Sequence, residues 1–329
     1  MTEWKPSLQD GRISILAKVA FPVWLFFVVV AIIPLVACYG ADQKPPEVID
    51  GDSEIITVVA TTTILGDVVS KLGGDDITLT ILLPPGVDPH GYEPTPQDIA
   101  LVSEAQVVFA VGNGLEEFLD NLIESAGAGE RIVYVSEALE LLTFEDEHEE
   151  HQISDSDPHT WTDPNNVISW AEKIDEVLER LDPARSESYQ YNLQDYVSQL
   201  EELDYWILME TQKVPENQRM LVSDHLTLGY FAQRYGFEQI GTVIPGYSSM
   251  AKPSAQELAE LEDLIRGFDV RAIFVGKSVN PDLAQRVAED TGIQLVFIYT
   301  GSLSEPGGEA DSYLKYMRYN TNAIIDALK

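Results

Sequence analysis

The chain has 329 residues, of which 20 are Lys or Arg and 55 are Asp or Glu, so its formal net charge is −35. An apolar share of 45% is normal for a globular protein, and the length suggests two domains. So acidic a chain has few cations with which to neutralise phosphates, which argues against nucleic-acid binding and against electrostatic docking on anionic lipid.

The N-terminus carries a secretion signal. Residues 19–37 are almost uninterrupted apolar, basic residues precede them, and the run ends in Leu-Val-Ala before Cys38. This order resembles the signal of bacterial lipoproteins, and Cys38, the only cysteine, is its lipidation site. We expect 1–38 to be a lipoprotein signal peptide and the mature protein to be extracytoplasmic and anchored to the cell membrane through lipid. The alternative is an uncleaved N-terminal transmembrane anchor.

Two sets of strands are expected after the signal. Residues 39–53 contain Pro, Gly and acidic residues without periodicity, which predicts a flexible linker. Beyond them, short β-branched runs alternate with helical stretches, as is typical of parallel sheets covered by helices on both faces. The expected strands are 55–60, 77–83, 107–111 and 132–135 in the first set, and 219–223, 239–243, 272–275 and 295–299 in the second.

The segment 183–213 predicts one long helix between the two sets. Its apolar residues recur at spacings of three and four, which makes a single stripe, and Asp182-Pro183 suits its start. We therefore expect an α/β fold with an N-terminal lobe at 54–182, a connecting helix at 183–213 and a C-terminal lobe at 214–329. The stripe consists of Tyr189, Leu193, Tyr196, Leu200, Leu203 and Ile207.

Three histidines are candidates for metal ligands. His90 and His159 each follow Asp-Pro in an Asp-Pro-His triplet, and His225 follows a predicted strand in Ser-Asp-His. Ligands of open α/β sheets bind outside the carboxyl ends of strands, so we expect one site in the cleft between the halves. We expect Trp161 to pack beside His159 and Asp163 to orient a ligand.

The acidic stretch 145–157 holds two further histidines, His148 and His151. It lacks an apolar face, which predicts a mobile surface loop. We treat the two histidines as an auxiliary cation-binding loop at most, and a solvated loop without bound metal is the alternative.

These motifs together resemble the TroA-like (cluster A-I) family, the zinc- or manganese-binding lipoproteins that serve bacterial ABC transporters as substrate-binding components. The resemblance covers about residues 54–329. It implies two (β/α) lobes, each with a parallel four-stranded sheet, joined by a long rigid helix, with metal in the cleft. The segments that carry it are 60–75, 82–98, 111–120, 157–166, 223–237, 241–261 and 301–320.

The family's three histidine ligands match His90, His159 and His225, but two acids that relatives often carry are absent. Gly301 stands where an Asp often precedes Ser-Leu, and Gly276-Lys277 stands where a Glu often follows a strand. Three alternatives follow: a water completes the coordination shell, another acid supplies the fourth ligand, or the metal is bound more weakly. The candidates for a fourth ligand, or for a residue that orients a ligand, are Glu93, Asp157 and Asp163.

The resemblance implies a metal receptor and not an enzyme: a monomer that captures a divalent ion and delivers it to a membrane permease. Three nitrogen ligands and few carboxylates favour Zn²⁺ over Mn²⁺, which prefers oxygen ligands. The alternatives are a Mn²⁺ receptor of the same class, a zinc-dependent hydrolase or lyase, and an adhesin that metal only stabilises. No His-Glu-x-x-His helix supports the enzyme.

Overall fold

The computed structural model describes residues 55–143 and 156–329, and this part of the chain contains two sheets of four parallel strands. The N-terminal half carries the sheet β2-β1-β3-β4 and the C-terminal half the sheet β6-β5-β7-β8, so both sheets have the same relative order. The strands are β1 (Ile56–Ala60), β2 (Ile77–Ile81), β3 (Val107–Ala110), β4 (Ile132–Tyr134), β5 (Met220–Ser223), β6 (Glu238–Thr242), β7 (Ala272–Gly276) and β8 (Gln294–Ile298).

All eight expected strands are confirmed, and their bounds differ from the prediction by one or two residues. The apolar runs are continuous because both faces of each sheet are buried. Val58 and Val59 are neighbours on β1, yet they belong to different apolar clusters on opposite faces. Phe274 and Val275 divide in the same way on β7.

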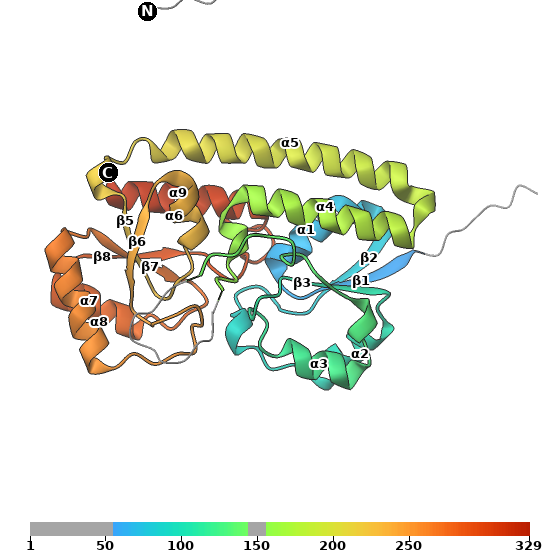
Figure 1. Ribbon diagram of the computed structural model, residues 1–329, viewed down its shortest axis with the longest axis horizontal. Helices are drawn as coiled ribbons and strands as arrows, with labels where there is room; N and C mark the ends of the chain where they lie inside the picture. Colours follow the sequence, from blue (N-terminus) through green and yellow to red (C-terminus); the bar gives the residue numbers. More distant parts are fainter. Residues whose placement is uncertain (1–54, 144–155) are drawn as a thin grey trace, which may run out of the picture. The chain divides into compact units, whose positions relative to one another are not determined.

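Helices cover both faces of each sheet (Figure 1). Helices α2 and α3 pack on one face of the first sheet, and α7 and α8 on one face of the second. The remaining faces are covered by α1, α4, α5, α6 and α9, whose buried side chains form one apolar cluster. The helices are α1 (Thr63–Gly73), α2 (Pro96–Glu104), α3 (Leu119–Ala126), α4 (Pro164–Leu181), α5 (Ser186–Thr211), α6 (Gly229–Tyr235), α7 (Ala255–Phe268), α8 (Asp282–Thr291) and α9 (Tyr313–Leu328).

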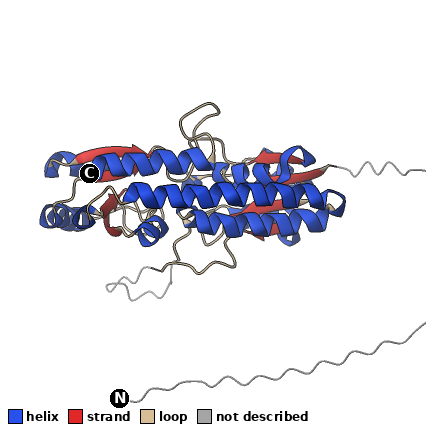
Figure 2. Ribbon diagram, turned by 90° about the horizontal axis from the view of Figure 1, so that it is seen from above, coloured by secondary structure: helices blue, strands red, loops and turns tan. Residues whose placement is uncertain are grey.

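Helix α5 is the predicted long helix, and it contacts α1 and α4 of the N-terminal half and α9 of the C-terminal half. Figure 2 shows the long helices side by side. The helix starts three residues later than predicted, because Pro183–Arg185 form a 3₁₀ turn in which Arg185 pairs with Asp182. Its stripe faces the core: Leu193 is partly buried and the other five residues are fully buried. The division into domains at 182 and 214 stays a prediction.

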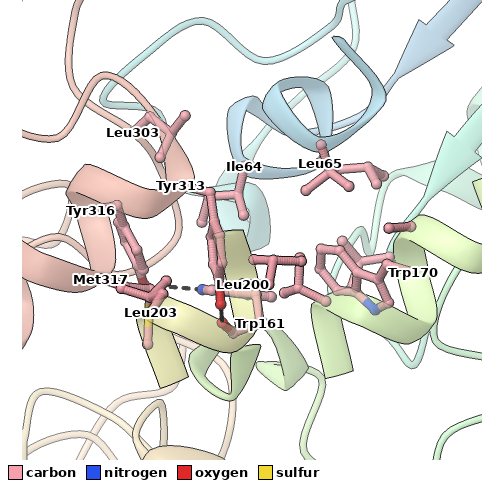
Figure 3. Close-up of a cluster of buried hydrophobic side chains, with 14 of the residues drawn as sticks. Ile64, Leu65, Trp161, Trp170, Leu200, Leu203, Leu303, Tyr313, Tyr316 and Met317 are labelled. Carbon is pink, nitrogen blue, oxygen red and sulfur yellow. Dashed lines mark hydrogen bonds between the residues drawn. The ribbon is translucent and has the colours of Figure 1, made fainter. Parts of the chain in front are cut away.

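The apolar core continues from one half into the other (Figure 3). Trp161, from the loop before α4, packs among residues of α9. Its indole Nε1 donates to the Tyr316 hydroxyl (3.1 Å), and the Tyr313 hydroxyl donates to the Trp161 carbonyl oxygen (2.8 Å). Separating the halves on this side would therefore expose large aromatic surfaces to water.

Several predicted features lie outside the described residues. These are the signal peptide 1–38 with Cys38, the linker 39–53, and the histidines His148 and His151. Within 55–143 and 156–329, no helix combines the length and the apolar character that crossing a membrane requires.

Asp204 on α5 joins three helices. Its carboxylate accepts two hydrogen bonds from the Arg234 guanidinium of α6 (3.0 and 2.6 Å), one from the Tyr235 hydroxyl (2.9 Å) and one from the Asn165 amide of α4 (3.3 Å). Burial alone would raise the pKa of Asp204, but the bonds from Arg234 and Tyr235 outweigh burial and lower it.

We predict that Asp204→Asn lowers the free energy of unfolding at pH 7 by about 1.5–3 kcal/mol, because charge-assisted hydrogen bonds between helices are lost. The pKa of Asp204 is lower in the folded than in the unfolded state, so its contribution is complete above the unfolded value of about 3.9 and is lost as pH falls through the folded value. Denaturant unfolding should show a smaller difference in unfolding free energy between the original protein and Asp204→Asn at pH 3.5 than at pH 7. Asp195→Asn, at an exposed position of the same helix, should change little at either pH.

Candidate metal centre

The three candidate histidines come from loops that follow strands of both sheets. His90 lies on a 3₁₀ turn, Pro89–Gly91, after β2, and Asp88 caps this turn. His159 immediately precedes the 3₁₀ turn Thr160–Thr162, and His225 lies two residues beyond the end of β5. Proline before His90 and before His159 restricts the backbone, so both imidazoles leave rigid turns.

The structure brings these histidines together. One ring nitrogen from each lies within 4.8 Å of the others, and all three side chains are buried. Nε2 of His90 is 3.2 Å from Nε2 of His159. Two nitrogens bound to one tetrahedral Zn²⁺ would be about 3.3 Å apart, so this pair already has the spacing that a shared ion requires. Among the described residues, no other group of three His, Cys, Asp or Glu side chains is gathered this closely.

Two carboxylates orient two of the imidazoles. Nδ1 of His159 lies 2.8 Å from Asp157 Oδ1, and Nδ1 of His225 lies 2.8 Å from Asp224 Oδ1. A carboxylate at Nδ1 holds the proton there and leaves the lone pair of Nε2 free. Nε2 of His225 is buried and has no hydrogen-bond partner among the described residues. An ion at the centre would satisfy it.

The two Asp-Pro-His triplets differ in how the acid is used. In both, the aspartate accepts the backbone N–H of the histidine two residues later: Asp88 from His90 (3.1 Å) and Asp157 from His159 (2.9 Å). Asp157 also reaches the imidazole, whereas Asp88 Oδ2 accepts from the Ser249 hydroxyl. His90 Nδ1 has no hydrogen-bond partner among the described residues.

Burial keeps the imidazoles of His90 and His159 neutral. It lowers the pKa of His90 to about 3, helped by the neighbouring His159 and His225, and it lowers the pKa of His159 well below its ordinary value. Burial raises the pKa of Asp157 to about 7. It would raise that of Asp224 as well, but His225 and the hydrogen bonds outweigh burial and lower it. Neutral imidazoles with an anionic neighbour are suited to bind a cation.

The candidates for a fourth ligand occupy different places. Asp157 lies in the centre, but its carboxylate is directed at His159. Glu93 is exposed, and Asp163 caps helix α4 by accepting the backbone N–H of Asn165 (2.8 Å). Trp161 packs beside His159 as expected, with ring centroids 5.2 Å apart.

Asp224 is the residue that sequence reasoning missed. It is buried and it is the acid on His225 Nδ1. Its signal is present in Ser-Asp-His, where the acid directly precedes the ligand candidate, but the acids proposed from the sequence are Glu93, Asp157 and Asp163.

Gly301 and Gly276, the positions at which the family resemblance implies acids, stand where side chains would not fit without rearrangement. A Cβ on Gly301 would lie 2.7 Å from Cδ of Pro89. A Cβ on Gly276 would lie 2.2 Å from Oγ1 of Thr300, and the backbone N–H of Gly276 donates to Asp224 (2.6 Å). The glycines therefore allow close approach of Pro89 and of Asp224, the neighbours of two ligand candidates.

A cleft of about 350 Å³ reaches His90 from the surface. Both halves line it, and its walls are mostly polar. The lining residues are His90, Asn113, Gly114, Glu117, Ser156, Pro158, Tyr247 and Ser248.

Comparison with known proteins finds the same fold and one family. The model of the ZnuA family, described as "Zinc-uptake complex component A periplasmic", matches residues 58–327. The manganese-binding lipoprotein MntA of Halalkalibacterium halodurans is 32% identical over 307 residues, covering 92% of this chain and 98% of that protein. The manganese ABC transporter substrate-binding lipoprotein PsaA of Streptococcus mitis is 30% identical, covering 92% and 97%.

Among solved structures, the periplasmic zinc binding protein TroA from Treponema pallidum matches with a TM-score of 0.76 and 26% identity. The match covers 83% of this chain and 99% of TroA. The two-sheet α/β fold expected from the resemblance is thus confirmed.

We predict that Asp157→Asn and Asp224→Asn each lower metal affinity about 10–100-fold, because the carboxylate that fixes an imidazole is lost. Asp88→Asn, at the equivalent place in the other triplet, should have a smaller effect, since Asp88 does not contact an imidazole. Competition with a fluorescent zinc chelator measures all three affinities. A larger loss in Asp88→Asn than in Asp157→Asn would contradict the assignment of orienting acids.

Proposed function

The chain belongs to the ZnuA family of zinc-uptake components, and from this premise we propose that it captures Zn²⁺ through His90, His159 and His225 and delivers it to a membrane permease. The family and the relatives make the chain the substrate-binding component of a metal ABC importer. One observation carries the ligand assignment: three buried imidazoles meet, and the Nδ1 atoms of His159 and His225 are held by carboxylates.

Zinc is favoured by the donor set. Three imidazole nitrogens, with no carboxylate of the described residues gathered with them as a fourth donor, suit tetrahedral Zn²⁺ with a water in the fourth position. Mn²⁺ prefers oxygen ligands. The names of two sequence relatives favour manganese instead, since MntA and PsaA are both named for it. TroA, the structural relative, is named for zinc. A manganese receptor of the same class is therefore the alternative.

Capture is helped by the state of the imidazoles. Because the pKa values of His90 and His159 are lowered, neither has to lose a proton at neutral pH before it binds the ion. Asp224, whose pKa is lowered, supplies a negative charge behind His225. Burial of the three imidazoles limits the access of bulk water to the bound ion and slows its escape.

Binding and release, without chemical conversion, fit this arrangement. A hydrolase or lyase would need a general base beside a metal-bound water. The two carboxylates in the centre, Asp157 and Asp224, are both engaged with imidazoles. We further propose that Cys38 is lipidated and that the receptor works outside the cytoplasmic membrane. Relatives that are named lipoproteins support this proposal.

We predict that purified protein binds Zn²⁺ at least about tenfold more tightly than Mn²⁺, as its nitrogen donors and the order of divalent affinities require. His225→Ala should lower zinc affinity by at least about 100-fold, more than the loss of an orienting acid. His148→Ala should barely change it. Chelator competition measures the affinities, and tighter binding of Mn²⁺ would favour the manganese alternative.

We predict that cells whose only copy carries His90→Ala and His159→Ala together take up zinc as slowly as cells that lack the gene. A receptor without ligands cannot load the permease. Zinc uptake in zinc-depleted medium is the measurement, with His148→Ala as the matched control. Normal uptake in the double variant would favour the adhesin, in which metal only stabilises the fold.

A further inference from the structure

Two kinds of contact join the halves around the metal centre. On one side the contacts are buried: Leu303 N donates to the Thr63 hydroxyl (2.9 Å), and the Trp161 indole donates to the Thr300 carbonyl oxygen (3.2 Å). Figure 3 shows the apolar side chains that surround them, with Leu303 near Ile64. Parting the halves here would expose Trp161 and its aromatic neighbours to water.

On the other side a short segment of the loop between β6 and α7 makes the contacts. We call residues 246–250 the serine strap. The Ser248 hydroxyl donates to Glu117 Oε1 (3.1 Å), and the Ser249 hydroxyl donates to Asp88 Oδ2 (2.5 Å). Two neighbouring serines of the C-terminal half thus bind carboxylates from two different loops of the N-terminal half.

The strap is connected to the metal centre at both ends. Asp88, which accepts from Ser249, also accepts the backbone N–H of His90. At the other end, Gly246 O accepts the backbone N–H of Leu226, the residue after His225. A movement of the strap would therefore act on the loops of two ligand candidates.

The serine strap also borders the cleft that leads to the metal centre. Ser248 and Glu117 both line the cleft that reaches His90, so the bond between them crosses this cleft. Met250 lies against the turn of His90: its Sδ is 3.1 Å from the position that a Cβ on Gly91 would occupy.

The two sides differ in how readily they open. Serine–carboxylate bonds at a half-exposed edge can be exchanged for bonds to water, so breaking them costs less than parting the buried side. The buried side has no such substitute, because its apolar surface gains nothing from water. The halves would therefore part at the strap and turn about the buried side.

We propose that Ser248 and Ser249 are positioning residues that hold the two halves together beside the cleft and set the rate at which the bound ion leaves. This inference rests on the proposed function, since it assigns a role to the strap in metal retention. The strap touches no ligand nitrogen, so it acts through Asp88 and Glu117.

The test is the rate of zinc release from the full-length protein with Ser248→Ala and Ser249→Ala combined. Trp161 lies beside His159, so tryptophan fluorescence reports the loaded state. The zinc-loaded protein is mixed with excess chelator in a stopped-flow instrument at several chelator concentrations. We expect release about tenfold faster or more, with association changed little, because the lost bonds involve charged acceptors. An unchanged release rate overturns the proposal.

Controls separate the strap from general damage. Ser103→Ala, whose hydroxyl bonds only within its own helix to Ala100, should release zinc like the original protein. Ser249→Thr keeps a hydroxyl and should retain slow release. Thermal unfolding of each variant checks that it is folded.

A double-mutant cycle identifies the partner. If the bond to Glu117 is the cause, Ser248→Ala should have no further effect on release in a Glu117→Ala protein. An equal acceleration in both backgrounds overturns the assigned contact. Failure of the original protein to bind zinc at all would instead refute the proposed function, so the two failures are distinguishable.

Discussion

One continuous apolar core determines where everything else in this part of the chain can lie. It runs from one sheet to the other beneath α5, and it contains the aromatic residues that join α9 to the loop of His159. Because this core is shared, each half presents the ends of its strands to the other in a defined position. The metal centre depends on that constraint, since no single half supplies all three histidines.

The centre itself depends on acids that lie behind the ligand candidates. A buried neutral imidazole without a hydrogen-bond partner could hold its proton on either ring nitrogen, so the nitrogen left to bind metal would not be fixed. Asp157 and Asp224 settle that choice for two of the three. Asp88 has the same place in sequence as Asp157 and a different task, which is to connect the turn of His90 to the other half. One short motif thus serves two physical purposes in the same molecule.

Much of the fold could be predicted from sequence, because strands buried on both faces leave continuous β-branched runs and α5 leaves a single stripe. The start of α5 was misplaced, since Pro183 suits a 3₁₀ turn as well as a first helical turn. The three histidines could be proposed because His90 and His159 share the Asp-Pro-His triplet and His225 directly follows a predicted strand.

Contacts between residues far apart in the sequence were harder to predict. Asp224 was adjacent to His225 and could have been found. The bonds of Ser248 and Ser249 join residues 131 and 161 positions apart, and no local pattern marks them. Such contacts depend on the relative placement of the two halves, which local propensity does not encode. Pro89 against Gly301 is a further case.

That last contact constrains which residue can stand at position 301. The ring of Pro89 already occupies the space next to Gly301. An aspartate placed there would collide with the turn that holds His90. Any residue larger than glycine at position 301 would have to push the Pro89 ring aside, so the absence of one side chain in the C-terminal half keeps a histidine of the N-terminal half in place.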